Sequence, residues 1–350
     1  MGLSGAQLGQ ALDLLDVGVS ADAAALEALA LRLQAVNDGQ KRSYERAWAG
    51  LLKAFCEAES AAADPGAALR ALTSPATSDG LVNPVVHRQS RPVRLDPGPF
   101  RAAEGRIVVV ADGGYRQIGC AEVSDARLVE RLAGLAGPHC GAIVELGAGW
   151  GRNLAALALR LERPDLRLIA AEQSQSGRDV AARLLQLGGR FRGEAAAFDF
   201  YAPDFGFLEG VEEALIFTHA AIEQIAFLPV DFIARLFAAC PRAVLALMEP
   251  FGWQAQPALA RNAVQRFLTD LRDGRDPSAV VEQHRFVLSD EALDLNSAVW
   301  ALAGRYSMNL LSVIRAAETA GVASIDALDL NWEGRNLFNP YSLAILRPAG

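Results

Sequence analysis

A glycine-rich turn at 142–153, with the sequence AIVELGAGWGRN, is the segment of this chain best suited to bind a ligand. Its apolar first half predicts a short buried strand, and a helical pattern begins after Gly151. Such a turn brings backbone N–H groups close to a ligand, because glycine has no Cβ. Gly147, Gly149 and Gly151 are spaced two apart, whereas a dinucleotide-binding turn reads G-x-G-x-x-G and would place its third glycine at Arg152. The spacing therefore disfavours a pyrophosphate-containing cofactor.

Three carboxylates lie within or after predicted strands that belong with this turn. Glu145 lies in the strand before the first glycine, Glu172 ends the second strand and Asp199 ends the third. The carboxyl ends of strands form the edge at which open α/β sheets bind ligands. There Glu172 can accept hydrogen bonds from two vicinal ribose hydroxyls, and Asp199, with the ring of Phe200 beside it, can meet an adenine. The three acids predict a nucleoside-containing ligand.

A second polar group follows the next two predicted strands. His219 lies at the end of strand 213–218, Glu223 comes four residues later, and Glu249 ends the strand that Pro250 stops. A neutral histidine at this edge can act as a general base, and a nearby carboxylate can fix its tautomer. Structural roles are the alternatives: a backbone partner for His219, an ion pair for Glu223 and a loop cap for Glu249.

Strands and helices alternate from Gly141 onward, which predicts parallel strands joined by right-handed crossovers with helices on both faces. The chain then continues with a mixed insertion or lid, about 273–304, and a helix that Gly321 closes. It ends in an antiparallel pair of strands. The predicted strands are 142–147, 166–172, 194–198, 213–218, 242–248, 325–332 and 341–347, and the predicted helices are 151–161, 176–187, 229–239, 257–272 and 308–320.

The first 100 residues are expected to form a helical cap or oligomerisation region with a Pro- and Arg-rich linker. Two or three amphipathic helices are predicted in 1–72, with an N-cap at Ser20 or Asp22 and a helix end at Asn37-Asp38-Gly39. The linker is either a solvated face or an anion-binding lip formed by His87, Arg88, Arg91, Arg94 and Arg101. Residues 101–140 lead into the core through a hairpin at 105–120 and a helix at 124–135 capped by Ser124.

From 141 to about 347 the chain resembles the class I S-adenosylmethionine-dependent methyltransferases. ELGAGWGRN resembles their glycine motif, Glu172 their ribose-binding acid, Asp199 their adenine-side acid, and the terminal hairpin their reversed last strand. The resemblance implies a doubly wound, Rossmann-like, seven-stranded sheet with an antiparallel last strand in a domain at 141–350. It also implies an enzyme with S-adenosylmethionine as cofactor. The cofactor-binding residues would be Glu145, Gly147, Ala148, Gly149, Gly151, Asn153, Glu172, Gln173, Asp199, Phe200 and Thr218.

In such an enzyme the acceptor lies beyond the fourth strand, so His219, Glu223 and Glu249 become the candidate catalytic residues. Members of the family that methylate amino groups carry N/D-P-P-Y/F after the fourth strand. At this place the chain reads THAAIE, which disfavours methylation of a nucleobase or a glutamine. We therefore expect O-methylation of a small-molecule or sugar-type hydroxyl with His219 as general base. A peptide or protein methyltransferase and a non-catalytic partner subunit are the alternatives.

Several neighbouring features are assigned lesser roles. Mg²⁺ on His219, Glu223 and Glu249 is conceivable, but the chain lacks the Asp-Asp or Asp-Asn pair of catechol-type enzymes, so no metal is predicted. Tyr115 and Arg116 either fold over the cofactor or form an ordinary hairpin. Asn339 and Tyr341 indicate turn chemistry rather than catalysis.

The composition limits the partners and the compartment. The 350 residues carry a net charge of −8, which argues against nucleic acid as a partner. The four cysteines form no CxxC pair, and we find neither a signal peptide nor a membrane span, so a cytoplasmic enzyme is expected. The apolar N-terminal helices would suit a homodimer.

Overall fold

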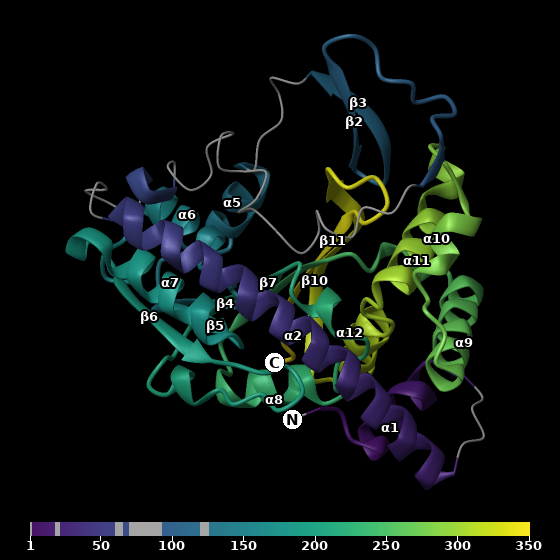
Figure 1. Ribbon diagram of the computed structural model, residues 1–350. Coiled ribbons are helices and arrows are strands. Elements are labelled where there is room, and N and C mark those ends of the chain that lie inside the picture. Colours follow the sequence, from purple (N-terminus) through teal and green to yellow (C-terminus); the bar gives the residue numbers. More distant parts are fainter. Residues whose placement is uncertain (1, 18–21, 60–65, 70–92, 120–125) are drawn as a thin grey trace.

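The computed structural model describes residues 2–17, 22–59, 66–69, 93–119 and 126–350 (Figure 1). Its central sheet has the strand order β3-β2-β10-β11-β8-β7-β4-β5-β6. The middle strands from β8 to β6 pair in parallel, and β11 is antiparallel to both of its neighbours. The bounds are β2 Arg106–Ala111, β3 Gly114–Gly119, β4 Ala142–Leu146, β5 Arg167–Glu172, β6 Arg192–Ala197, β7 Ala214–His219, β8 Val244–Glu249, β10 Ala323–Gly334 and β11 Tyr341–Pro348.

Helices cover both faces of the sheet, because each strand of the parallel part alternates its apolar side chains between two cores. In β4, Val144 and Leu146 belong to the core that contains helices α8 and α12, whereas Ile143 belongs to the core on the opposite face. The opposite face carries α5, α6 and α7. The bounds are α5 Ala126–Ala133, α6 Arg152–Leu161, α7 Gln175–Gln186, α8 Phe232–Ala239 and α12 Leu310–Thr319.

The predicted fold class is confirmed by this topology. Seven strands from β10 to β6 form the expected doubly wound sheet with a reversed last strand. The sheet is nonetheless wider than expected, because Glu333 and Gly334 at the end of β10 pair with Val110 and Ala111 of β2. The predicted hairpin at 105–120 thus joins the sheet as two further strands.

The N-terminal region differs from the prediction at one point. The prediction that a helix ends at Asn37-Asp38-Gly39 is wrong, since α2 runs without interruption from Ala23 to Glu59. A glycine inside a helix costs about 1 kcal/mol. Burial of the helix before and after Gly39 outweighs that cost. Leu33, before the glycine, packs in one core, and Trp48, after it, packs in another. Ser20, His87, Arg88, Arg91 and Ser124 lie outside the described residues.

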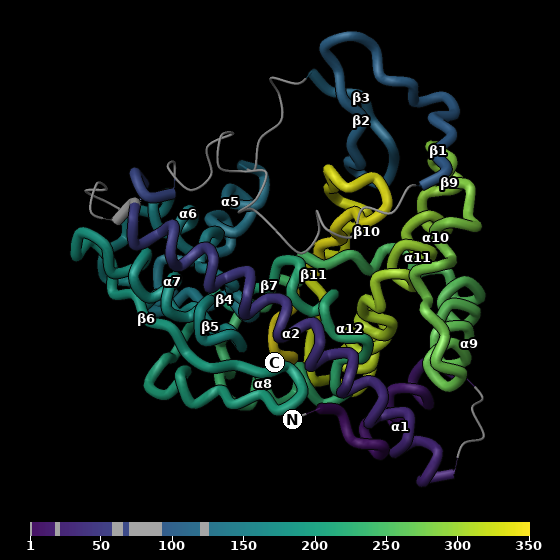
Figure 2. Tube along the Cα trace, viewed as in Figure 1, coloured from purple at the N-terminus to yellow at the C-terminus, as the bar shows by residue number. Residues whose placement is uncertain are grey.

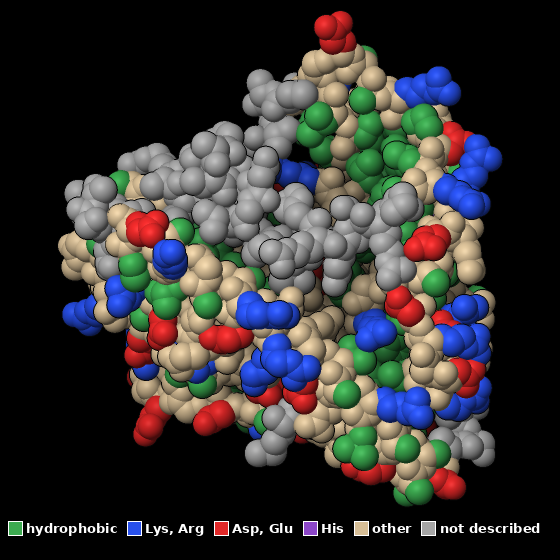
Figure 3. Space-filling model, in the orientation of Figure 1, with side chains coloured by type: hydrophobic (Ala, Val, Ile, Leu, Met, Phe, Trp, Pro, Cys, Tyr) green, Lys and Arg blue, Asp and Glu red, His purple; other side chains and the backbone are tan. Residues whose placement is uncertain are grey.

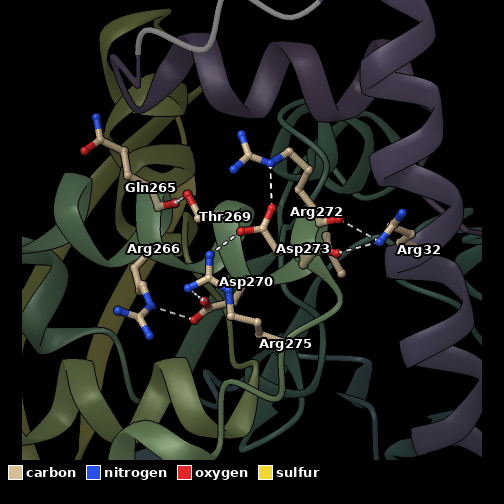
Figure 4. A network of polar contacts seen from close by, with 9 residues as sticks. Arg32, Gln265, Arg266, Thr269, Asp270, Arg272, Asp273 and Arg275 are labelled. Atoms are coloured by element: carbon tan, nitrogen blue, oxygen red, sulfur yellow. Dashed lines mark hydrogen bonds and ion pairs between the residues drawn. The ribbon is translucent and has the colours of Figure 1, made fainter.

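Helix α2 crosses the carboxyl edge of the parallel strands and is attached at both ends (Figure 1). It packs against α1 (Gly5–Leu14) and α9 (Pro257–Asp273) near its start and against α7 further on. Arg32 donates from Nη1 to the carbonyls of Leu271 and Arg272, at 3.1 and 2.9 Å, in the last turn of α9 (Figure 4). An arginine on the final carbonyls of a helix is favourable, because those groups have no partner within the helix.

The insertion after α9 is partly helical, as expected, and adds a small sheet. It contains α10 (Ala279–Gln283), β9 (Arg285–Val287) and α11 (Leu293–Gly304). Strand β9 pairs in parallel with β1 (Arg94–Asp96), so two segments far apart in sequence lie side by side (Figure 2). Phe286 and Phe338 pack with ring centroids 4.3 Å apart and join the insertion to the β10–β11 loop.

The surface is mixed in charge where it can be seen. Basic and acidic side chains of the described residues intermingle on the face that α2 crosses (Figure 3). Among the helices of the described ranges, none is both long and apolar enough to cross a membrane.

Candidate active site

The glycine turn after β4 adopts a backbone that other residues rarely take. Gly147, Gly149 and Gly151 have φ angles of 74°, 54° and 79°, all in the left-handed region. A Cβ at Gly147 would lie 2.4 Å from the Cβ of Ala221, so this glycine also permits the close approach of the loop after β7. Gly151 packs α6 against α7, because its Cβ would lie 3.0 Å from that of Ala181, and it does not line the cavity described below.

Glu145 is buried beneath this turn. Its Oε1 accepts a hydrogen bond from Asn153 Nδ2 at 2.8 Å, and its Oε2 accepts one from the backbone N–H of Leu154 at 3.2 Å. Burial raises the pKa of Glu145 to about 8, against the opposing effect of these two donors. The acid therefore fixes the first turn of α6 and holds the Asn153 amide in place.

Glu172 connects the loops that follow β4 and β5 through hydrogen bonds. Its Oε2 accepts a hydrogen bond from Gly149 N at 2.9 Å, and its Oε1 accepts one from Ser174 N at 2.8 Å. The side chain lines the cavity together with Gln173, Ala148 and Asn153. Each carboxylate oxygen has more than one lone pair, so Glu172 can accept further bonds from a ligand.

The segment after β6 supplies the third part of the turn region. Asp199 follows the strand by two residues and accepts from Tyr201 N on Oδ1 at 2.9 Å. Phe200 is buried, with its ring 5.0 Å from that of Phe198 in an edge-on contact. Both Asp199 and Phe200 line the same cavity as Glu172. The three strand ends thus meet as the sequence predicts.

One cavity of about 550 Å³ joins these residues to the second polar group. Its volume lies within the range of small-molecule sites, roughly 300–1,000 Å³. Helix α2 forms its roof with Gln34, Asn37, Lys41, Tyr44 and Trp48. Glu45 on the same helix accepts hydrogen bonds from the backbone N–H groups of Gln175 and Ser176, at 2.9 and 3.1 Å, and so attaches the roof to the start of α7.

His219 and Glu223 both line the far end of this cavity, but they have different neighbours. The His219 ring lies against Tyr341, with centroids 4.6 Å apart, and its Nδ1 is 3.5 Å from Asn153 Nδ2. Glu223 instead accepts hydrogen bonds from Asn339 Nδ2 at 2.7 Å and Gln224 Nε2 at 2.8 Å. The turn that carries Glu223 is a short 3₁₀ turn, Ile222–Gln224.

Burial raises the pKa of Glu223 to about 8, and the nearby Glu249 adds to this effect. Glu249 lies outside the cavity lining. Its Oε1 accepts from the N–H groups of Ala221 and Ile222, at 3.0 and 3.1 Å, and its Oε2 accepts from Glu223 N at 3.0 Å. Burial raises the pKa of Glu249 to about 7. The structure therefore places Glu249 as a support for the 221–223 turn, next to Ala220 with its left-handed φ of 54°.

Other predicted residues lie away from the cavity. Thr218 is fully buried and does not line it. Tyr115 is buried in the core formed with the insertion and donates its hydroxyl to Leu337 O at 3.0 Å, and Arg116 pairs with Asp290 at 3.4 Å. The ordinary-hairpin alternative therefore describes these two residues, which do not line the cavity.

The sequence prediction missed several residues that the structure brings to the far end. Trp300 and Tyr306 come from the insertion and the segment after it, and Arg335, Asn336 and Asn339 come from the β10–β11 loop. Asn339 was expected only to shape a turn, yet it holds Glu223. Apart from the NPYS turn itself, no spacing in the sequence links these segments to His219.

Within the described ranges, no group of three or more His, Cys, Asp or Glu side chains is arranged to hold a metal ion. The Glu223 carboxyl accepts hydrogen bonds from two side-chain amides, and the Glu249 carboxyl accepts hydrogen bonds from backbone N–H groups.

No protein-family model and no curated protein matches this chain. Solved structures that it is similar to include a SAM-dependent methyltransferase from Aquifex aeolicus, with 14% identity over 64% of this chain and 93% of that chain and a TM-score of 0.35. The O-methyltransferase NcsB1 from neocarzinostatin biosynthesis, in complex with SAM and 2-hydroxy-5-methyl naphthoic acid, has 18% identity over 64% and 56% and a TM-score of 0.35. The mitomycin 7-O-methyltransferase MmcR has 16% identity over 64% and 54% and a TM-score of 0.36.

Proposed function

We propose that this chain is an S-adenosylmethionine-dependent methyltransferase that methylates a hydroxyl group of a small-molecule or sugar-type acceptor. The observation that carries the proposal is the meeting of the left-handed glycine turn, Glu172 and Asp199 at the ends of three adjacent parallel strands, in one cavity. That edge is where open α/β sheets bind nucleosides.

The residues present fit the proposed cofactor. Glu172 reaches the cavity with acceptor capacity for ribose hydroxyls, while Asp199 and Phe200 offer a carboxylate and a ring for an adenine. Glu145 and Asn153 lie at the other side of the turn, where they would face the methionine part. When bound, the cofactor supplies a methyl group on a positively charged sulfur.

The chain itself has to align the acceptor and take its proton. We propose His219 as the proton acceptor, since its ring lines the cavity at the end of β7, three strands along the sheet from β6, which Asp199 follows. Tyr341 packs against the ring, and Asn153 lies close to Nδ1, so both restrict its orientation. Glu249 contributes indirectly by holding the turn that follows His219.

The roof over the cavity bears on the size of the acceptor. Helix α2 covers the carboxyl edge of the strands and is attached to α7 through Glu45 and to α9 through Arg32. A covered cavity favours a small acceptor over a segment of another protein. A peptide or protein methyltransferase is therefore only the second candidate.

Isothermal titration calorimetry with S-adenosylhomocysteine and with NADH tests the proposal. We expect S-adenosylhomocysteine to bind with one site per chain and NADH to give no saturable heat. Binding of NADH without binding of S-adenosylhomocysteine would reject a methyltransferase in favour of an oxidoreductase. A titration in which neither ligand binds would leave the non-catalytic scaffold as the remaining reading.

A further inference from the structure

The far end of the cavity has an unusual composition for a pocket that binds small organic molecules. In the described residues, the whole cavity lining includes no leucine, valine or methionine, and Ile225 is its one branched aliphatic side chain. Aromatic rings and flat polar groups take their place. Pockets for apolar ligands are instead lined mainly by hydrophobic side chains, with few polar groups. The lining therefore offers a ligand aromatic faces together with polar groups instead of an aliphatic surface.

A buried carboxyl and two amides form the polar centre of this end. Glu223 is 6% exposed and Asn339 is 7% exposed, and they are joined by the 2.7 Å hydrogen bond from Asn339 Nδ2. Gln224 donates to the other carboxyl oxygen of Glu223. Each carboxyl oxygen keeps one lone pair, and Asn339 keeps its second N–H and its carbonyl oxygen, for which we find no donor among the described residues. Such a set can both donate to and accept from a ligand.

Tyr306 adds a hydroxyl that has no hydrogen-bond partner among the described residues. It lines the cavity, and its pKa is raised by burial and by the nearby Glu223. The Tyr306 side chain is only partly buried, so its hydroxyl can be reached from the cavity. A phenol hydroxyl both donates and accepts, and next to Glu223 it can therefore bond to a ligand group.

The aromatic rings supply the apolar contact that a sugar ring also needs. Trp300, Tyr306 and Tyr341 line this end, and Tyr341 is held in place by the His219 ring. Aromatic rings bury a large area while keeping a polar tip, so they suit ligands that have both C–H faces and hydroxyl edges.

We propose that the acceptor is a non-aromatic, polyhydroxylated molecule of the sugar or cyclitol class. Glu223, Asn339 and Tyr306 would hold the hydroxyl groups next to the one that is methylated. Each hydroxyl group of such a molecule can both donate and accept hydrogen bonds, and so it matches the donors and acceptors of these three side chains. This inference rests on the proposed function and specifies its acceptor.

Two other acceptor classes match the cavity less well. A phenol with one hydroxyl would cover the Glu223–Asn339 pair with a C–H edge and leave Tyr306 unpaired. An ammonium acceptor would call for a charged carboxylate, whereas burial and the nearby Glu249 raise the pKa of Glu223 and so disfavour its charged form. A protonated carboxyl supplies a donor to a neutral hydroxyl.

The test measures transfer of a labelled methyl group from S-adenosylmethionine to three sets of compounds: methyl glycosides and inositols, phenols and catechol, and aliphatic amines. Ligand-detected NMR with S-adenosylhomocysteine present measures binding of the same compounds. We expect transfer to, and binding of, members of the first set. Tyr306→Phe and Glu223→Gln should each lower kcat/KM for that acceptor about tenfold, the value of one lost hydrogen bond, while the affinity for S-adenosylhomocysteine stays unchanged.

The outcomes separate this inference from the proposed function. If S-adenosylhomocysteine binds but phenols or amines are methylated in preference, or if no polyol is methylated or bound, the polyol acceptor is wrong and the cofactor assignment stands. If S-adenosylhomocysteine does not bind, the methyltransferase proposal itself fails. Glu130→Gln makes the same carboxyl-to-amide change in an exposed ion pair with Arg160 and should alter neither measurement. A tenfold loss in that control would contradict the roles of Tyr306 and Glu223.

Discussion

The two ends of the cavity are built in different ways. The end at the glycine turn uses residues at or just after the ends of three parallel strands, 145–153, 172–174 and 199–201. The far end combines the turn after β7 with the insertion and with the β10–β11 loop, so its side chains come from 219–225, 300–306 and 335–341. The first end follows from the fold itself, whereas the second depends on how separate segments pack.

The two ends also differ in what holds their residues in place. The glycine-turn end is held by its backbone, because its glycines have left-handed conformations that other residues rarely adopt and because Glu172 accepts hydrogen bonds from backbone N–H groups. The far end is held by side chains, above all by the Glu223–Asn339 pair. A fold can therefore keep one ligand at the first end and change its specificity at the second.

Gly147→Ala should have the largest effect, since it disrupts the glycine-turn end. The left-handed backbone costs an alanine about 1–2 kcal/mol, and the contact at 2.4 Å with Ala221 adds roughly 1–3 kcal/mol. We expect denaturant unfolding to show a loss of about 2–5 kcal/mol and calorimetry to show no binding of S-adenosylhomocysteine.

Gly210→Ala is the matched control for this change. Gly210 has a φ of 75°, but nothing lies within 4 Å of its added Cβ. It should therefore lose only the backbone cost of about 1–2 kcal/mol and keep its ligand affinity. Equal losses of stability in the two variants would show that the close contact with Ala221 does not contribute to the effect of Gly147→Ala.

Acidic residues at both ends should make stability depend on pH. The pKa values of Glu145 and Glu223 are raised to about 8 and that of Glu249 to about 7, from 4.5 when unfolded. Between these values the folded chain binds more protons than the unfolded chain, so the free energy of unfolding falls as pH rises from about 4.5 to 8. Urea unfolding at pH 5.5 and pH 8 measures this slope.

Glu223→Gln should flatten that slope, because the amide does not titrate. Glu130→Gln, an exposed carboxylate whose pKa is lowered by Arg160, should leave the decrease between pH 5.5 and 8 as it is. A stability that rises over this interval in the wild-type chain would mean that the buried acids are ionised in the folded state.

A smaller effect is expected at the roof, which spans both ends. Glu45→Gln removes charge from the bonds to Gln175 and Ser176 and should cost about 1 kcal/mol. Because α2 covers the cavity, the affinity for S-adenosylhomocysteine should fall severalfold, with faster amide hydrogen exchange in α2. Unchanged exchange would show that the apolar contacts of Trp48 alone hold the roof.

The smallest effect is expected for Arg32→Met, at the other attachment of the roof. Arg32 is exposed and bonds to two carbonyls at the end of α9, a helix-terminus contact worth about 0.3–1 kcal/mol (Figure 4). Thermal unfolding should show a decrease of a few degrees at most, with no change in ligand affinity. A large loss of affinity would place the control of the cavity at this contact instead of at Glu45.

The sequence predicts the residues of the glycine-turn end better than those of the far end, for a physical reason. Gly147, Glu172 and Asp199 are found from the sequence because alternation of strands and helices forces their strand ends together. His219 and Glu223 share this advantage, since they follow β7. The link between Glu223 and Asn339 spans 116 positions, and Tyr306, which lies near Glu223, comes from another part of the chain, so no local pattern reveals these neighbours.

Two further differences arise from competition between local and tertiary effects. Asn37-Asp38-Gly39 favours a helix end, but burial of Leu33 and Trp48 on either side keeps α2 continuous. Glu249 was expected at the catalytic rim, with a loop cap as the alternative, and its carboxyl accepts hydrogen bonds from the backbone of 221–223, as the alternative describes. In each case, packing in the folded chain determines the outcome.

The affinity for S-adenosylhomocysteine, measured by calorimetry on Glu172→Ala and Glu223→Gln side by side, tests the division of the cavity most directly. The account predicts a loss of about tenfold or more for Glu172→Ala, because charged hydrogen bonds to the ribose are removed, and wild-type affinity for Glu223→Gln. Equal affinities in the two variants, or a loss confined to Glu223→Gln, would contradict the assignment of the glycine-turn end to the cofactor.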